Sequence, residues 1–187
     1  MKTVISVSAV LALSGAAMAD VLLIVDLTVP NQITINSTTG LSAIDATASN
    51  FNGVYLENAF GLSGALGAVL VSGNLTSFNN PSDNSPSLFR GGAGADPGLN
   101  IWSYSTDATT SFTAGVQAFA GSGTWNLSTA GYEALLAGAS SGNIYANIDN
   151  IGGVPGNGIL GTWALIPTPG AAGLLGLAGL AAVRRRR

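Results

Sequence analysis

Short apolar runs of strand length, separated by clusters of Gly, Asn, Ser and Pro, dominate the chain between residues 20 and 166. In QITIN (32–36) the isoleucines alternate with Thr and Asn, which is the period of a strand with one buried face. The polar clusters read as turns, and no long segment has a helical period. We expect roughly nine strands, at 21–29, 32–36, 52–58, 64–73, 100–105, 115–121, 123–128, 143–149 and 161–166.

One short segment is predicted to be helical. Ser128 has the character of an N-terminal helix cap, and Gly138 is suited to end the same helix. Residues 79–100, which contain Arg90, are expected to form a long polar loop. Many short strands with one small helix indicate an all-β domain, and we predict an antiparallel β-sandwich or jelly roll over residues 20–166.

The charged and reactive residues are few. The chain has no cysteine and no histidine, so it has no disulfide framework, no thiol nucleophile and no thiolate metal site. Between residues 20 and 166, Arg90 is the single basic residue against nine acids, a net charge of 1 − 9 = −8. A surface this acidic repels phosphate backbones, so we expect no nucleic-acid partner.

The first residues have the pattern of a secretory signal peptide. A single positive charge at Lys2 precedes a short apolar run, and Ala17 and Ala19 place small side chains at both recognition positions of a signal peptidase. We predict that residues 1–19 are removed and that Asp20 becomes the N-terminus. The alternative interpretations are an N-terminal core strand and a membrane helix, for which the run is short.

The last residues combine a proline pair, an apolar run and a basic end. Residues 171–183 are 13 consecutive apolar residues, which as a helix extend about 20 Å, against about 30 Å for a bilayer core. Pro167 and Pro169 prevent the helix from extending backwards. Positive charge is retained on the cytoplasmic side of a membrane, so a membrane stop is expected at Arg184, Arg185, Arg186 and Arg187.

This layout resembles the PEP-CTERM sorting signal of bacterial surface proteins. Pro167-Thr168-Pro169, followed by Gly170, stands where the family has a Pro-Glu-Pro-like tripeptide, and Thr168 replaces the usual Glu. The resemblance implies that residues 167–187 hold the protein at the membrane until an exosortase-type transpeptidase processes it. It also links the protein to envelopes that produce extracellular polysaccharide. The alternative is a plain C-terminal anchor that is never cut.

A second resemblance covers residues 127–163, which look like the C-terminal part of the chordin-type (CHRD) domain of bacterial secreted proteins. Leu135-Leu136-Ala137-Gly138 and Tyr145-Ala146-Asn147-Ile148 match that family, and Asp149 stands where the family has His. The resemblance implies a shared sandwich topology and no more.

Catalytic groups are scarce. A nucleophile–base triad cannot be assembled, because the chain has neither His nor Cys and no lysine after Lys2. A glycosidase-type carboxylate pair stays open, with the only two glutamates, Glu57 and Glu133, each beside a tyrosine, Tyr55 or Tyr132. We interpret both acids as solvent-facing charges and predict no catalytic residue.

Three other patterns are compatible with ligand binding. GNGILG (156–161) matches a dinucleotide motif, but a strand follows it in place of a helix, so a turn is predicted and no cofactor. Calcium is the one metal with suitable oxygen ligands, at Asp83, Asn84, Asp96, Asp149 and Asn150. A sugar-stacking face is the alternative to core packing for the aromatic residues Trp102, Tyr104, Trp125 and Trp163.

The sequence therefore favours a non-enzymatic, exported protein of the cell surface or extracellular matrix. Its expected partners are signal peptidase, an exosortase-type enzyme, the membrane and extracellular polysaccharide. The alternatives are a secreted carbohydrate-binding module and a carboxylate-dependent glycan hydrolase.

Overall fold

The fold was obtained as a computed structural model, which describes residues 19–49, 53–75, 86–102, 109–147 and 158–166. One α-helix, α1 (Thr129–Leu136), one short 3₁₀ turn, η1 (Gly92–Gly94), and eleven strands lie in these ranges. The strands are β1 (Val21–Asp26), β2 (Gln32–Ser37), β3 (Ala46–Ser49), β4 (Val54–Leu56), β5 (Val69–Gly73), β6 (Ser87–Phe89), β7 (Leu99–Trp102), β8 (Thr109–Phe112), β9 (Ser122–Asn126), β10 (Ser141–Ala146) and β11 (Ile159–Leu165).

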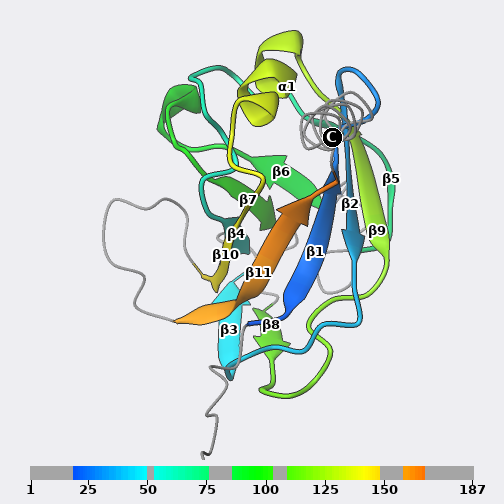
Figure 1. The fold of residues 1–187 in the computed structure, drawn as a ribbon, viewed down its shortest axis with the longest axis vertical. Helices are drawn as coiled ribbons and strands as arrows, with labels where there is room; N and C mark the ends of the chain where they lie inside the picture. Colours follow the sequence, from blue (N-terminus) through cyan, green and yellow to red (C-terminus); the bar gives the residue numbers. More distant parts are fainter. Residues whose placement is uncertain (1–18, 50–52, 76–85, 103–108, 148–157, 167–187) are drawn as a thin grey trace, which may run out of the picture.

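Nine of these strands form one sheet, in the order β5-β9-β2-β1-β11-β10-β4-β7-β6. The sheet curls until it is nearly closed (Figure 1), and its two edge strands are β5 and β6. β3 and β8 form a separate two-stranded sheet, at the bottom of Figure 1. The expected all-β class is confirmed. The finer expectation of a sandwich or jelly roll is not confirmed by this arrangement.

The sheet is mixed, which corrects the expectation of a purely antiparallel one. β1 and β11 are parallel neighbours, with Ile24 opposite Ala164 and Val25 opposite Leu165. Every other strand pair in the described residues is antiparallel. A parallel pair needs a long crossover connection, and here the connection is the rest of the domain. Such a pairing leaves no local mark in the sequence.

A single apolar core fills the curled sheet. Alternate side chains of β2 point inward, where Ile33 and Ile35 are fully buried between polar neighbours. The largest core side chains are Trp125 of β9 and Trp163 of β11. Helix α1 lies over one end of the core, at the top of Figure 1, and contributes Leu135.

The predicted short helix is confirmed. Ser128 is its N-cap: the Ser128 Oγ accepts a 3.0 Å hydrogen bond from the Gly131 N–H, which satisfies one of the free amides of the first turn. Ala137 is the C-cap, and Gly138 follows it.

Several strand assignments differ from the sequence prediction. Residues 115–121 were expected to form a strand but contribute only an isolated bridge between Leu41 and Gln117. β3, β6 and β8 were not predicted, because each is only three or four residues long, and β3 and β8 also have few large apolar side chains. β6 and the buried Arg90 lie in the stretch expected to be a polar loop.

Candidate functional site

The two ends of the domain lie on neighbouring strands. The Asp20 carbonyl accepts a 2.8 Å hydrogen bond from the Thr162 N–H of β11, and the Asp20 Oδ2 accepts a 2.8 Å bond from the Leu41 N–H. At the far end of the same strand pair, the Ile166 N–H donates to the Val25 carbonyl at 2.8 Å. Because β1 and β11 run parallel, Asp20 and Ile166 lie at opposite ends of the sheet (Figure 1).

Most of the predicted sorting residues lie outside the described residues. These are Ala17 of the signal peptide, the motif Pro167, Thr168, Pro169 and Gly170, the apolar run 171–183, and the arginines Arg184, Arg185, Arg186 and Arg187. Ala19 and Asp20 are described, immediately before β1. Among the described residues, no helix is long and apolar enough to cross a bilayer.

Arg90 is the centre of a buried polar cluster that the sequence did not predict. The side chain is 7 % exposed, and its guanidinium donates to three main-chain carbonyls, at 2.7 Å to Asp96, 3.0 Å to Gly64 and 2.7 Å to Leu62. Its Cζ lies 3.9 Å from the ring centroid of Phe60. Burial lowers the pKa of Arg90 from its ordinary value, while Asp96 and Tyr55 oppose that shift.

Asp96 connects this cluster to the sheet. Its Oδ1 accepts a 2.6 Å hydrogen bond from the Tyr55 hydroxyl of β4 and a 2.7 Å bond from the Gly98 N–H. Asp96 is 7 % exposed and Tyr55 is fully buried. A buried carboxylate held in this way is a structural connection between distant segments.

A surface groove of about 320 Å³ lies beside Arg90, between the segment before β5 and the segment that contains β6. Its walls are formed mainly by small and apolar residues. Arg90 is the one charged residue in the described lining, and it directs its hydrogen bonds to main-chain carbonyls, so this lining offers no acid or base suited to catalysis. The lining residues are Ala65, Leu66, Gly67, Ala68, Leu88, Phe89, Arg90, Ala93 and Gly94.

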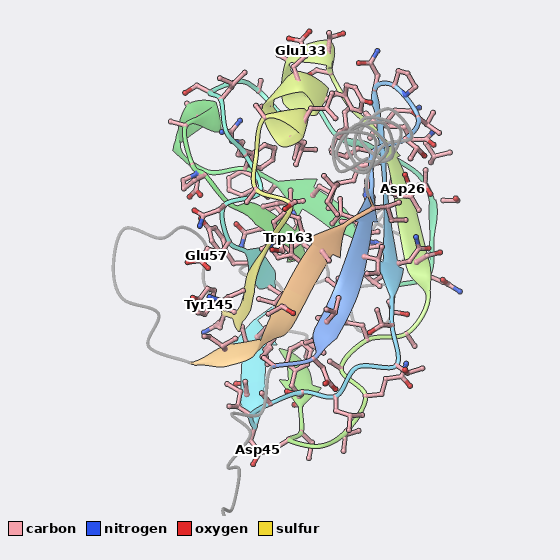
Figure 2. The ribbon with its side chains drawn as sticks, in the orientation of Figure 1. Asp26, Asp45, Glu57, Glu133, Tyr145 and Trp163 are labelled. Carbon is pink, nitrogen blue, oxygen red and sulfur yellow. The ribbon has the colours of Figure 1, made fainter. Side chains whose placement is uncertain are left out.

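Glu57 belongs to a second polar cluster, on the outer side of the sheet. The Asn143 Nδ2 donates to the Glu57 Oε2 at 2.9 Å and to the Tyr145 hydroxyl at 3.1 Å. The Trp163 Nε1 donates to the Glu57 carbonyl at 3.1 Å. Glu57 is therefore held by its neighbours, and Tyr145 lies beside it (Figure 2).

The two glutamates do not form a pair. Figure 2 shows Glu133 on α1, at the top of the domain, and Glu57 well below it beside β10. The geometry therefore offers no glycosidase-type arrangement of these two acids, which requires facing carboxylates across a cleft.

The described residues cover the other ligand-binding patterns only in part: Tyr104 and four of the five predicted calcium ligands, Asp83, Asn84, Asp149 and Asn150, lie outside them. Of the aromatic set, Trp125 and Trp163 are 1 % and 2 % exposed and fill the core, so neither is available to stack on a sugar. No group of three metal-ligating side chains occurs in the described part of the chain. The described part of the glycine motif, 158–161, runs into β11 (Ile159–Leu165) and not into a helix.

Comparison with protein-family models gives no match for this chain. Comparison with curated proteins and with solved structures gives no match either. The functional argument therefore depends on the residues of this chain alone.

Proposed function

We propose that this chain is an exported, non-enzymatic protein of the cell surface or extracellular matrix, delivered by an N-terminal signal peptide and sorted through a PEP-CTERM-like C-terminal signal. The order of three elements carries the proposal: the motif Pro167-Thr168-Pro169-Gly170, a short apolar run at 171–183, and a terminal arginine cluster at 184–187. A 13-residue helix is short for a permanent span, so its proposed role is to hold the chain while an exosortase-type enzyme acts.

The positions of the domain ends support this proposal. Asp20 would be the first residue after signal-peptide removal, and its main chain already bonds to Thr162. Ile166, the last residue before the proposed signal, is tied to β1 through Val25. Cleavage at either end would therefore leave the sheet intact, because both strands are held by the hydrogen bonds of their neighbours.

The non-enzymatic part of the proposal is supported by composition and by placement. The sequence has no His and no Cys. Glu57 and Glu133 lie on different elements, and Glu57 is engaged by Asn143. A carboxylate hydrolase would need a second acid facing one of them, so this alternative is the weakest.

A secreted carbohydrate-binding module remains the alternative function. Its sugar-stacking version loses support because Trp125 and Trp163 are core residues. For the fold, we retain as a proposal a sandwich or jelly-roll relationship, because opposite walls of the curled sheet pack against each other around one core.

Sequencing the two ends of the envelope protein tests the proposed function. We expect an N-terminus at Asp20 and a C-terminal peptide that ends before Arg184, both read by mass spectrometry of the protein from its own cell envelope. A protein that begins at Met1 would contradict export by the signal peptide. A surface form that still carries Arg187 would identify the tail as an ordinary anchor and reject sorting.

A further inference from the structure

Four apolar side chains are exposed at the end of the domain where β11 ends and α1 lies (Figure 1). They are Val29 at 52 %, Leu62 at 57 %, Leu136 at 44 % and Ile166 at 37 %. A single exposed residue of this kind is common on a protein surface. What distinguishes these four is that they come from four separate segments and lie at one end.

Hydrogen bonds to α1 hold two of these segments beside the helix. The Gly61 N–H donates to the Ala134 carbonyl at 2.9 Å, which fixes the segment after β4 against α1. The Tyr132 hydroxyl donates to the Leu27 carbonyl at 2.8 Å, which fixes the start of the connection between β1 and β2 there as well. We call this part of the domain the α1 end.

The chain leaves the sheet at the α1 end. Leu165 of β11 and Leu135 of α1 line the same small cavity, so the strand ends beside the helix. Four residues, 167–170, separate Ile166 from the apolar run at 171–183. Four residues extend at most about 14 Å. If the apolar run is in a membrane, Ile166 is therefore held within about 14 Å of it.

The opposite end of the domain also has exposed apolar residues, among them Leu41 and Val116. The Leu41 N–H donates to the Asp20 Oδ2 at 2.8 Å, and the Val116 carbonyl accepts a 2.9 Å bond from the Ser42 N–H. Asp20 and Ile166 lie at opposite ends of a parallel strand pair about 20 Å long. The connection at 167–170 is shorter than this, so it favours the α1 end as the part that meets the membrane.

We propose that the α1 end of the domain rests on the lipid surface while the C-terminal run is in the membrane. The contact is made by Val29, Leu62, Leu136 and Ile166. The proposal rests on the proposed function, because it requires residues 171–183 to be inserted. Tethering makes this second contact intramolecular, so a face that is weak by itself is sufficient.

Charge determines which lipid surface the α1 end accepts. Figure 2 shows Asp26 and Glu133 at this end, and the segment 20–166 has a net charge of −8. Anionic lipids give a membrane a negative surface potential, which repels acidic groups. The proposed surface is therefore zwitterionic.

Fluorescence quenching in lipid nanodiscs tests this contact. The exported chain with its tail intact is reconstituted from detergent into phosphatidylcholine discs, one copy to a disc. Because the natural chain has no cysteine, Leu136→Cys can carry a single polarity-sensitive label. A nitroxide on the lipid headgroup should remove most of the emission of this label. Val116→Cys is the matched control at the opposite end, exposed to a similar degree, and its label should keep most of its emission.

Co-elution of the chain with the discs, measured on the same samples, separates two kinds of failure. A chain that does not co-elute has no inserted tail, which would reject both the tether and the docking. A chain that co-elutes while the Leu136 label is quenched no more than the Val116 label would reject docking alone. A label that is shielded from water but not quenched would show that protein, such as a second copy, covers the α1 end, and would also overturn the proposal.

A charge placed on the α1 end gives an independent test. Leu62→Glu should restore the emission of the Leu136 label without releasing the chain from the disc, and Val116→Glu should not. Phosphatidylserine added to the discs should reduce the quenching as well, and salt should reverse that reduction. Quenching that persists in Leu62→Glu, or that grows with phosphatidylserine, would place the membrane contact on another surface and overturn the proposal.

Discussion

The Tyr55 hydroxyl donates a 2.6 Å hydrogen bond to the Asp96 carboxylate, which lies 41 residues further along the chain. Both residues are buried, and Asp96 also gives its main-chain carbonyl to Arg90. This contact joins the outer side of β4 to the loop that follows β6. The hydrogen bonds of Tyr55, Arg90 and Gly98 to Asp96 hold this loop against the sheet.

Tyr55→Phe is expected to destabilise the domain by about 1.5–3 kcal/mol, the range for a hydrogen bond to a charged group. The ring is kept, so the change isolates the hydroxyl and leaves the Asp96 carboxylate with one fewer donor. Urea unfolding followed by tryptophan fluorescence measures the effect. Tyr132→Phe is a less buried control that loses a neutral bond to Leu27 and should cost about 0.5–1.5 kcal/mol.

Arg90→Lys is expected to be more harmful than a conservative change of charge suggests. A lysine keeps the positive charge but cannot donate in a fork to the carbonyls of Leu62, Gly64 and Asp96. The cost should be about 3 kcal/mol or more, since buried carbonyls are left without donors. Thermal unfolding of wild type and variant compares them. Equal midpoints would mean that Arg90 does not hold these segments together.

Gly98→Ala should prevent normal folding, because a Cβ at this position would overlap the Tyr55 ring and hydroxyl. Expression level and near-ultraviolet circular dichroism report the loss. Gly115→Ala serves as the comparison: no atom lies within 4 Å of its Cβ, but its φ is +75°, so only backbone strain of about 1–2 kcal/mol is expected. If both variants behaved alike, the close approach at Gly98 would not be what constrains this site.

Glu57→Gln and Glu133→Gln should leave any binding or matrix phenotype nearly unchanged. Glu133→Gln alters an exposed helix residue, and Glu57→Gln only weakens the bond from Asn143. A glycan-cleavage assay with each purified variant beside wild type is the direct check. Cleavage by wild type that either substitution abolishes would make the protein a carboxylate-dependent enzyme.

Replacing the arginines at 184–187 with serine should let the tail pass through the membrane, because the retained positive charges are gone. Unprocessed protein is then expected in the medium. Replacing Pro167 and Pro169 with alanine should instead leave a membrane-bound precursor, since the apolar run and its charges survive. Immunoblots of medium and membrane fractions, with mass spectrometry of the C-terminal peptide, separate the two results. Identical fractionation of both variants would contradict the proposed division of roles.

Local patterns in the sequence predicted what is local in the fold. The alternation in residues 32–36 predicted β2, and Ser128 predicted the start of α1. β3 and β8 were missed because ATAS and TTSF have little apolar content. Their strand conformation comes from the antiparallel pairing that they make with each other. The parallel pairing of β1 with β11 was missed because no residue near either strand signals a neighbour from the far end of the domain.

The buried cluster was missed for a different reason. Arg90 was expected on a solvated loop, since isolated arginines are rarely buried. Its burial depends on carbonyls from two separate segments, at 62–64 and at 96, which converge only after folding. The one feature of the sequence that set Arg90 apart is that it is the single basic residue between residues 20 and 166, against nine acids.

The neighbouring parallel strands have a mechanical consequence. A protein held through its C-terminal segment receives every external pull at Ile166, the residue that follows β11. Force along that direction slides β11 lengthwise against β1 on one side and β10 on the other. The hydrogen bonds between β11 and each of its two neighbours are then loaded in shear together, and they do not open one after another. If the proposed sorting signal holds the chain at the cell surface, this pairing of β11 with both neighbours opposes extension of the domain from Ile166.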